Sequence, residues 1–414
     1  METAPRSMRL QIAVAGRTNS GKSSFMNLIA GQDVAITSPV PGTTTDVVEK
    51  AMELRPLGPV LFLDTAGIDD ETELGNRRIE RSGRAFDRAD VILLVTGAGV
   101  WGAPEERMLA VARDRKVSLI PIVNKCDQTA PAPEFLAKLR EATGFEPLCV
   151  SSNGGEAERE RVLPLLKDAL LAGCPEDFLT PPPLLGDLVK PGDTVVLIVP
   201  VDIQAPKGRL ILPQVQAVRD ALDSDALCYV VKESAYRSAL ANLREKPALV
   251  VCDSQVVDLM VRETPADVPC TTFSILFARL KGDMNVLAAG AGRIRSLRPG
   301  DRVFIAEACT HHASDDDIGR VKIPRWLAKF VGGELHVTVG AGRDYPADLS
   351  KYQLVIHCGS CMLNRRETLR RIENARRSGV PITNYGMAIS TCHGVLERVL
   401  SPFPEALEAF RRGN

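Results

Sequence analysis

Residues 10–30 read LQIAVAGRTNSGKSSFMNLIA, in which an apolar run, a glycine-rich run and a helical run follow one another directly. Residues 16–23 fit the pattern G-x-x-x-x-G-K-S/T at the junction that the motif requires, between a strand and a helix. Glycines there let backbone N–H groups converge on phosphate oxygens, and the start of the helix adds positive potential. We expect Lys22 to contact the β- and γ-phosphates of a nucleotide and the Ser23 hydroxyl to bind Mg²⁺.

Further segments indicate which nucleotide is bound. Asp64 ends the apolar run PVLFLD, so its carboxylate lies at a strand end where it can help to hold the metal ion. Asp127, in NKCD at 124–127, can accept hydrogen bonds from N1–H and the exocyclic amine of guanine, a donor pair that adenine lacks. The loop SSN at 151–153 follows the next strand, where it would touch the base, and PGTTTD at 41–46 suits a sensor of the γ-phosphate. The predicted nucleotide-binding residues are Gly16, Asn19, Ser20, Gly21, Lys22, Ser23, Ser24, Asn124, Lys125, Asp127, Ser151 and Ser152. The predicted Mg²⁺ ligands are Ser23, Thr44 and Asp64, and the predicted catalytic residues are Lys22, Thr44, Asp64 and Gly67.

These motifs resemble those of translation-factor-class GTPases, most closely the branch of tRNA-modification and Era-like GTPases. The resemblance covers the first domain and implies that it binds GTP or GDP and hydrolyses GTP.

Ile68 stands where Ras-like proteins carry the glutamine that orients the attacking water, so we expect slow intrinsic hydrolysis or another way of placing the water. In the tRNA-modification branch an asparagine of the phosphate-binding loop helps to bind K⁺. Asn19 matches that asparagine, and the alternative is a polar loop residue without a ligand.

The length and composition indicate several α/β domains. At roughly 150 residues per domain, 414 residues suggest about two to four domains. Short β-branched runs alternate with helical stretches nearly throughout, which is typical of mainly parallel sheets, and three prolines at 181–183 indicate a linker. We predict three consecutive α/β domains with mainly parallel sheets, the first a P-loop GTPase (Ras-like/Era-like) fold. Their ranges are a GTPase domain at 1–173, a Pro-rich linker at 174–192, a middle domain at 193–266 and a C-terminal domain at 267–414.

The charge balance and the cysteine content narrow the class of protein further. Lys and Arg total 51 against 52 Asp and Glu, which gives no global electrostatic case for a nucleic-acid or membrane partner. The first residues have no apolar core of signal-peptide type, and no apolar run is long enough to span a bilayer. We therefore expect a cytoplasmic protein, in which the ten cysteines stay reduced and serve as packed side chains or as ligands.

Cysteine and histidine cluster in the predicted C-terminal domain. Cys309 and His311 follow the strand DRVFIAEA, while His357, Cys358 and Cys361 follow the strand YQLVIH. Both groups lie at carboxyl ends of predicted parallel strands, where open α/β sheets bind ligands, and a helix begins just after Cys361. Metal binding is expected if the two strands are neighbours. A structural Cys₃His zinc site and an Fe–S cluster with an exchangeable fourth position both fit the spacing, whereas a dithiol would not need Cys309 or His311.

The combination of motifs resembles the [FeFe]-hydrogenase maturation GTPases, and the segments CTHHASDDDIGRVKIPRWL at 309–327 and VIHCGSCMLNRRE at 355–367 strengthen the match. The resemblance covers essentially the whole chain. It implies a [4Fe-4S] cluster on Cys309, Cys358 and Cys361, with His357 or His311 as candidate fourth ligand. It also implies a homodimer formed by the middle domain. The implied role is a scaffold and carrier that takes a transient diiron precursor with CO and CN ligands from radical-SAM maturation enzymes to the hydrogenase apoprotein, with nucleotide as a switch on partner binding.

A second interpretation is an RNA- or ribosome-associated Era-like GTPase with a structural Cys₃His zinc site. Its support is the arginine-rich segment at 365–377 and the Era-like first domain. No KH-type GXXG segment and no RRM-type aromatic signature is present, and glutamates interrupt the arginines. Nucleic acid is therefore not an expected partner, and a solvated or partner-docking helix face is favoured.

Overall fold

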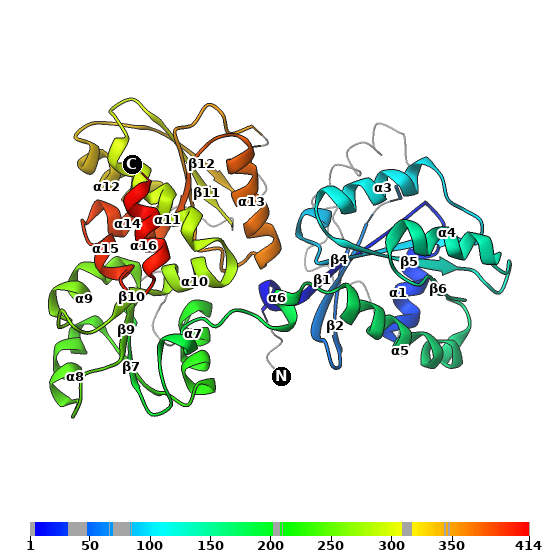
Figure 1. The fold of residues 1–414 in the computed structure, drawn as a ribbon, viewed down its shortest axis with the longest axis horizontal. Helices are drawn as coiled ribbons and strands as arrows, with labels where there is room; N and C mark the ends of the chain where they lie inside the picture. The colour runs from blue at the N-terminus through cyan, green and yellow to red at the C-terminus, as the bar shows by residue number, and fades with distance from the viewer. Residues whose placement is uncertain are drawn as a thin grey trace. The chain divides into compact units, whose positions relative to one another are not determined.

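The computed structural model describes residues 5–31, 48–65, 67–68, 83, 85–201, 208, 210–308, 317–342, 345–346 and 348–413. The chain divides into two compact units, Met1–Pro181 and Pro182–Asn414, which are described separately (Figure 1). No helix among the described residues is both long and apolar enough to cross a membrane.

The first unit is built on a six-stranded sheet of order β2-β3-β1-β4-β5-β6. Its neighbouring strands run parallel except for the antiparallel pair β2 and β3. The strands are β1 (Leu10–Gly16), β2 (Val48–Leu54), β3 (Gly58–Asp64), β4 (Val91–Gly97), β5 (Ser118–Asn124) and β6 (Leu148–Cys149). The described helices are α1 (Lys22–Ala30), α3 (Ala103–Asp114), α4 (Pro133–Thr143), α5 (Gly155–Gly173) and α6 (Glu176–Leu179).

Both faces of this sheet are covered, as the continuous apolar run of β1 requires. Ile12 and Val14 belong to a cluster that includes Phe25 of α1. The alternate residue Ala13 belongs to a second cluster, which includes Met108 of α3. Because successive side chains of a strand point to opposite faces, β1 is buried on both sides, and its carboxyl end holds the glycine-rich loop at the sheet edge.

The second unit contains two parallel four-stranded sheets, of order β10-β9-β7-β8 and β12-β11-β13-β14. The strands of the first are β7 (Thr194–Ile198), β8 (Leu227–Val231), β9 (Leu249–Cys252) and β10 (Cys270–Thr272). Those of the second are β11 (Arg302–Glu307), β12 (His336–Ala341), β13 (Leu354–His357) and β14 (Ile382–Asn384). The helices are α7 (Leu212–Asp223), α8 (Tyr236–Asn242), α9 (Val257–Glu263), α10 (Phe273–Lys281), α11 (Met284–Gly292), α12 (Ile323–Val331), α13 (Arg365–Arg377), α14 (Tyr385–Cys392), α15 (Leu396–Val399) and α16 (Pro404–Arg412).

One apolar cluster runs through the whole second unit. It includes Val250 of the first sheet and Phe304 and Ile356 of the second. Helix α10 contributes Ile275 and Phe277 to this cluster. It contacts α7, which packs on the first sheet, and α13, which packs on the second, so α10 links the two halves of the unit (Figure 1). The first sheet ends on one side in β8, on which the side chains of Leu227, Tyr229 and Val230 are exposed.

The predicted α/β class with mainly parallel sheets is confirmed, and the runs PVLFLD, DRVFIAEA and YQLVIH form the strands β3, β11 and β13. The antiparallel strand β2 and the three-residue strand β10 were not predicted, because neither shows a continuous apolar run or clear alternation. The domain boundaries given above stay predictions.

Candidate functional site

Two glycines fix the path of the loop between β1 and α1. Gly16 has φ +153°, and a Cβ there would lie 2.2 Å from the carbonyl oxygen of Val95 on β4. Gly21 has φ +93°, and a Cβ there would lie 2.2 Å from Nδ2 of Asn124. Both positions therefore exclude any larger residue. They let the loop backbone pass close to β4 and to the side chain that ends β5.

The side chains predicted to hold phosphate and Mg²⁺ come together at the start of α1. Lys22 donates from Nζ to the carbonyls of Gly16 at 3.0 Å and Arg17 at 2.9 Å. Ser23 donates from Oγ to Oδ2 of Asp64 at 3.2 Å, while Oδ1 of Asp64 is buried without a hydrogen-bond partner among the described residues. Burial raises the pKa of Asp64, and the Lys22 charge and the Ser23 hydrogen bond oppose the shift. A buried carboxylate oxygen with no donor beside a serine hydroxyl suits a divalent cation.

The predicted base-recognition segments are tied to the same loop. Asn124 donates from Nδ2 to the carbonyl of Ser20 at 3.0 Å and accepts, at Oδ1, from Oγ of Ser152 at 2.7 Å. Lys125 donates from Nζ to the carbonyl of Asn19 at 2.8 Å. Three segments far apart in sequence are thereby held at one sheet edge. The predicted residues Asp127 and Ser24 are exposed, and the backbone N–H of Ser151 donates to Glu158 at 2.8 Å.

Ile68 points away from this site. Its side chain is 8% exposed and belongs to the apolar cluster of Ala13 and Phe86. Its backbone N–H donates to the carbonyl of Gly16 at 3.2 Å, beside the predicted catalytic residue Gly67. The described part of the site therefore has an inward-facing apolar side chain where Ras-like proteins carry glutamine. Thr44, with the rest of 41–46, lies outside the described residues.

An ion pair missed at the sequence level braces the phosphate-binding loop. Arg17 donates from Nε and Nη2 to the two carboxylate oxygens of Glu105, both at 2.7 Å. Glu105 is 1% exposed and also accepts from the backbone N–H of Gly102 at 2.9 Å. No local pattern indicates this contact, because the two partners are 88 positions apart in the chain.

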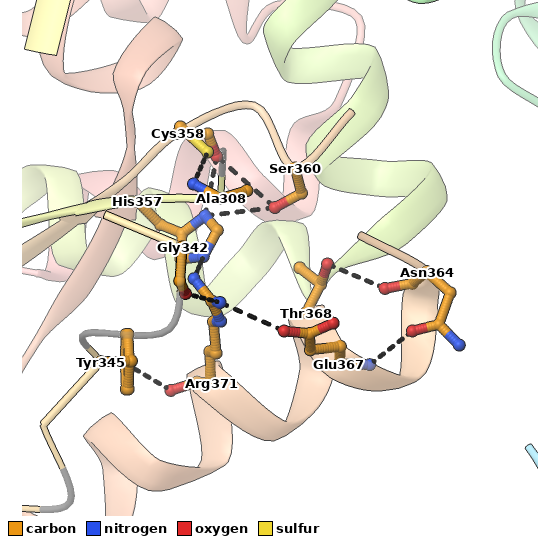
Figure 2. Close-up of polar contacts among 10 residues, drawn as sticks. All are labelled: Ala308, Gly342, Tyr345, His357, Cys358, Ser360, Asn364, Glu367, Thr368 and Arg371. Atoms are coloured by element: carbon orange, nitrogen blue, oxygen red, sulfur yellow. Dashed lines mark hydrogen bonds and ion pairs between the residues drawn. The ribbon is translucent and has the colours of Figure 1, made fainter. Parts of the chain in front are cut away.

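The cysteine loop follows β13 in the second unit. The strands that precede Cys309 and Cys358 are neighbours, because β13 pairs with β11 and places His357 opposite Ala306. Cys358 donates its N–H to the carbonyl of Ala306 at 2.9 Å. Ala308 in turn donates its N–H to Sγ of Cys358 at 3.1 Å (Figure 2). Cys309 and His311 lie outside the described residues. Among those described, no group of three His, Cys, Asp or Glu side chains is placed to hold a metal ion.

The two described cysteines flank a tight turn before α13. Ser360 adopts φ +56°, and the N–H of Leu363 donates to the carbonyl of Ser360 at 3.1 Å. Asn364 then caps α13 by accepting the N–H of Glu367 at 3.1 Å. Cys358 and Cys361 are both half-buried. The N-terminal end of α13 thus follows the thiols directly, as predicted from the sequence.

Both ring nitrogens of His357 have partners (Figure 2). Nδ1 lies 2.8 Å from the carbonyl oxygen of Cys358, and Nε2 accepts from Nη1 of Arg371 at 3.1 Å. Burial and the charge of Arg371 lower the pKa of His357 to about 3, while the Cys358 carbonyl opposes the shift. A neutral ring that donates from Nδ1 and accepts at Nε2 satisfies both contacts. In this arrangement the ring has no free lone pair for a metal.

A buried lysine also underlies the cysteine loop. Lys281, the last residue of α10, is 3% exposed. Its Nζ donates to the backbone carbonyls of Ser360, Cys361 and Leu363. Burial lowers the pKa of Lys281 to about 8, and the thiols of Cys361 and Cys358 oppose the shift. Sequence reasoning missed it, since a lysine ending an apolar helix looks like an ordinary solvent-facing C-terminal residue.

Five of the other described cysteines lie in packed surroundings. Cys252 and Cys270 are buried on β9 and β10, and Cys174, Cys228 and Cys392 are half-buried. Burial raises the pKa of each of these five thiols, so they stay protonated and poorly suited as metal ligands.

Three segments of the chain match models of known protein families. Residues 184–282 match the family model described as the hydrogen maturase F dimerization domain, and residues 284–402 match the hydrogen maturase F tetramerization domain. These two matches together span more than half of the 414 residues. The chain belongs to the hydrogen maturase F family. Residues 11–125 match a model described as a 50S ribosome-binding GTPase.

The curated relatives match part of the length of this hydrogen maturase F family member. The tRNA modification GTPase MnmE of Synechococcus sp. (strain JA-3-3Ab) is 41% identical over 160 residues, which are 37% of this chain and 33% of that protein. MnmE of Nitrosomonas europaea is 31% identical over 163 residues, 39% of this chain and 34% of that protein. The chain thus spans about a third of the length of the curated relatives it matches.

Solved structures give weaker likenesses. An Era variant from Aquifex aeolicus bound to GDP.AlF4- has 23% identity and a TM-score of 0.34, with 54% of this chain and 92% of that chain covered. The G domain of the T. maritima FeoB transporter has 22% identity and a TM-score of 0.30, with 40% and 98% covered.

The hydrogen maturase F matches divide the second unit between α10 and α11. Lys281 lies in the segment that matches the dimerization model, whereas the cysteine loop with which it bonds lies in the tetramerization match. The boundary between the two family segments therefore runs beside the candidate metal site.

Proposed function

We propose that this chain is a GTP-hydrolysing maturation factor for [FeFe]-hydrogenase that holds an Fe–S cluster at its cysteine loop. The observation that carries the proposal is the pairing of two sites in one member of the hydrogen maturase F family. One is the loop that joins Gly16, Lys22 and Asp64 to Asn124, and the other is the thiol loop after β13.

The nucleotide site has the groups that GTP hydrolysis needs. Lys22 would exchange its two carbonyl partners for the β- and γ-phosphates, and Ser23 and Asp64, with Thr44, would hold Mg²⁺. Asp127 would accept the two guanine donors. With Ile68 turned into the core, the position of the water-orienting glutamine has no polar side chain, so intrinsic turnover is expected to be slow. Asn19 is the proposed K⁺ ligand, since its backbone already holds Lys125 beside the phosphate-binding loop.

The cysteine loop fits an Fe–S cluster by its donors. Cys358 and Cys361 flank one turn, and Ala308, which bonds to the Cys358 sulfur, precedes Cys309 in the chain. When bound on three thiolates, a [4Fe-4S] cluster supplies one iron with an exchangeable fourth ligand. The bonded ring of His357 argues for a supporting role rather than ligation, which leaves His311 or a non-histidine group as fourth ligand. The cargo is the transient diiron precursor with CO and CN ligands, received from radical-SAM maturation enzymes and passed to the hydrogenase apoprotein.

A homodimer through the middle domain is part of the proposal. The edge strand β8 presents Leu227 at 56%, Tyr229 at 47% and Val230 at 45% exposure, and its outer backbone edge has no neighbouring strand among the described residues. Natural proteins usually cover or charge such an edge. Pairing with a second copy would bury these side chains, in keeping with the dimerization match at 184–282. Partner binding would then respond to the nucleotide through the loops around the γ-phosphate.

Metal analysis after anaerobic reconstitution of the full chain tests the proposal. We expect about four irons and four sulfides per chain, an EPR signal on reduction, and GTP hydrolysis by the same preparation. Stoichiometric zinc that iron does not replace, together with salt-sensitive RNA binding, would instead support the ribosome-associated interpretation. The pairing of Glu373 with Arg376 and Arg377, within α13, weakens that alternative.

A further inference from the structure

The three hydrogen bonds of the Lys281 ammonium group all go to backbone carbonyls of the cysteine loop. Nζ donates to the carbonyls of Ser360 at 3.1 Å, Cys361 at 3.3 Å and Leu363 at 2.8 Å. An ammonium has three N–H groups, so these contacts match its donor count. They fix the carbonyls on both sides of Cys361, and therefore the direction in which this residue leaves the backbone.

The charge of Lys281 has no carboxylate partner among the described residues. Its side chain is 3% exposed, and the other close group is the Phe277 ring, whose centre lies 5.5 Å from Nζ. A buried cation is costly unless an opposite charge lies near. The sulfur atoms of Cys361 and Cys358 are the nearby groups that would carry the opposite charge as metal-bound thiolates. The lysine is thus placed to offset negative charge that develops at this loop.

A reciprocal contact locks the two segments together. Arg365, the first residue of α13, donates from Nη1 to the carbonyls of Leu280 at 2.8 Å and Gly282 at 3.2 Å. The side chain at the end of α10 therefore holds the cysteine loop, and a side chain just after that loop holds the end of α10. A shift of α10 would move the carbonyls beside Cys361 with it.

We propose that Lys281 is the positioning residue of the cysteine loop: it orients Cys361 and offsets the negative charge of a thiolate-bound cluster. The inference rests on the proposed Fe–S function and adds to it the group that sets the charge balance of the site. A cluster held by three thiolates carries net negative charge, which increases on reduction, so a nearby cation favours the reduced form and raises the reduction potential.

The test uses the full chain reconstituted anaerobically, in three variants. Lys281→Met removes charge and hydrogen bonds, Lys281→Gln keeps hydrogen bonding without charge, and Lys281→Arg keeps the charge. Iron and sulfide content, the midpoint potential from an EPR-monitored titration, and the thermal midpoint are measured for each. Tyr236→Phe is the matched control, because it removes a buried hydrogen bond to Thr264 in the same unit, at 2.6 Å, and changes no charge.

We expect the Met and Gln variants to shift the potential to more negative values, Arg to stay near the wild type, and Tyr236→Phe to lower only the thermal midpoint. Failure of the Met and Gln variants to hold iron, with rescue by Arg and an unchanged thermal midpoint, supports the proposal as well. An unchanged potential in both uncharged variants overturns it, as does loss of iron in all three with a collapsed fold. If the wild-type chain itself holds no cluster, the proposed function fails first.

Discussion

The backbone N–H of Ala308 donates to the sulfur of Cys358 across a sequence separation of 50 residues, at 3.1 Å. Ala308 follows β11 and Cys358 follows β13, so this contact extends the pairing of the two strands beyond their ends. Cys309 is the next residue in the chain, and successive Cα atoms lie about 3.8 Å apart. N–H···S contacts of this kind are among the features that set Fe–S potentials, so the backbone here is already suited to thiolate ligands.

The nucleotide site and the cysteine loop lie in different compact units, and their chemistry should separate by mutation. Lys22→Ala is expected to abolish measurable GTP hydrolysis, because it removes the lysine that the motif places at the β- and γ-phosphates. Iron content should stay at the wild-type level. Cys309→Ala, Cys358→Ala and Cys361→Ala should each lose iron and keep GTP turnover. Cys228→Ala, at a half-buried cysteine of β8, is the control and should change neither. A Lys22→Ala protein without iron would contradict this independence.

K⁺ should stimulate GTP hydrolysis through Asn19. A cation beside the phosphates offsets the charge that develops during hydrolysis, and loss of one such group typically costs about tenfold or more in rate. We expect the wild type to turn over faster in K⁺ than in Na⁺ at equal ionic strength, and Asn19→Ala to show equal, slow rates in both. Wild-type rates that do not depend on the choice of cation would rule out the K⁺ site.

Glu105 should stabilise the first unit in a pH-dependent way. Burial alone would raise the pKa of Glu105, but hydrogen bonds from Arg17 and from backbone N–H groups hold it below the usual 4.5. The unfolded chain then binds the proton first as the pH falls, so the contribution is complete above pH 4.5 and is lost below it as the folded carboxylate titrates. Glu105→Gln should cost about 2 kcal/mol at pH 7 and less at pH 3.

Urea unfolding followed by circular dichroism at both pH values measures that difference. Glu134→Gln, at an exposed position of α4, is the control and should stay within about 0.5 kcal/mol of the wild type. An equal loss of stability at both pH values in Glu105→Gln would show that the carboxylate charge is not the source.

Charge on the edge strand β8 should block self-association. Tyr229→Lys places an ammonium on an edge that the proposed dimer buries, which is a common way to prevent strand pairing. Light scattering at micromolar concentration should report a monomer for this variant and a larger species for the wild type. Leu165→Lys, at a leucine of α5 that is 50% exposed in the other unit, should leave the mass unchanged. A monomeric wild type would remove the dimer from the proposal.

The sequence was sufficient wherever function depends on residue type and local spacing. The P-loop pattern at 16–23 predicted the strand, the turn and the helix, because the glycines at its ends have steric reasons to be glycine. The apolar run at 10–16 likewise predicted a strand, and the structure shows that this strand is covered on both faces. The sequence alone showed that Ile68 stands where Ras-like proteins carry the water-orienting glutamine. The structure adds that the Ile68 side chain packs into the apolar core.

Contacts that join distant segments could not be predicted in this way. Lys281 bonds to backbone carbonyls about 80 residues later, and carbonyls are present at every position, so no residue type marks the partner. Arg371 engages His357 from the helix that follows the cysteine loop, which changes the histidine from a candidate ligand into a bonded, neutral ring. Such bonds depend on tertiary proximity, which only the packed fold supplies.

The single apolar cluster that runs through both sheets of the second unit has a thermodynamic consequence. We expect a core shared in this way to unfold as one cooperative transition, so that whatever binds only the folded form stabilises all of it. A metal held at the cysteine loop would thus raise the melting temperature of the β8 edge as well, and chelation would make that distant strand easier to open. Amide hydrogen exchange at β8 would then report on occupancy of a site that it does not touch.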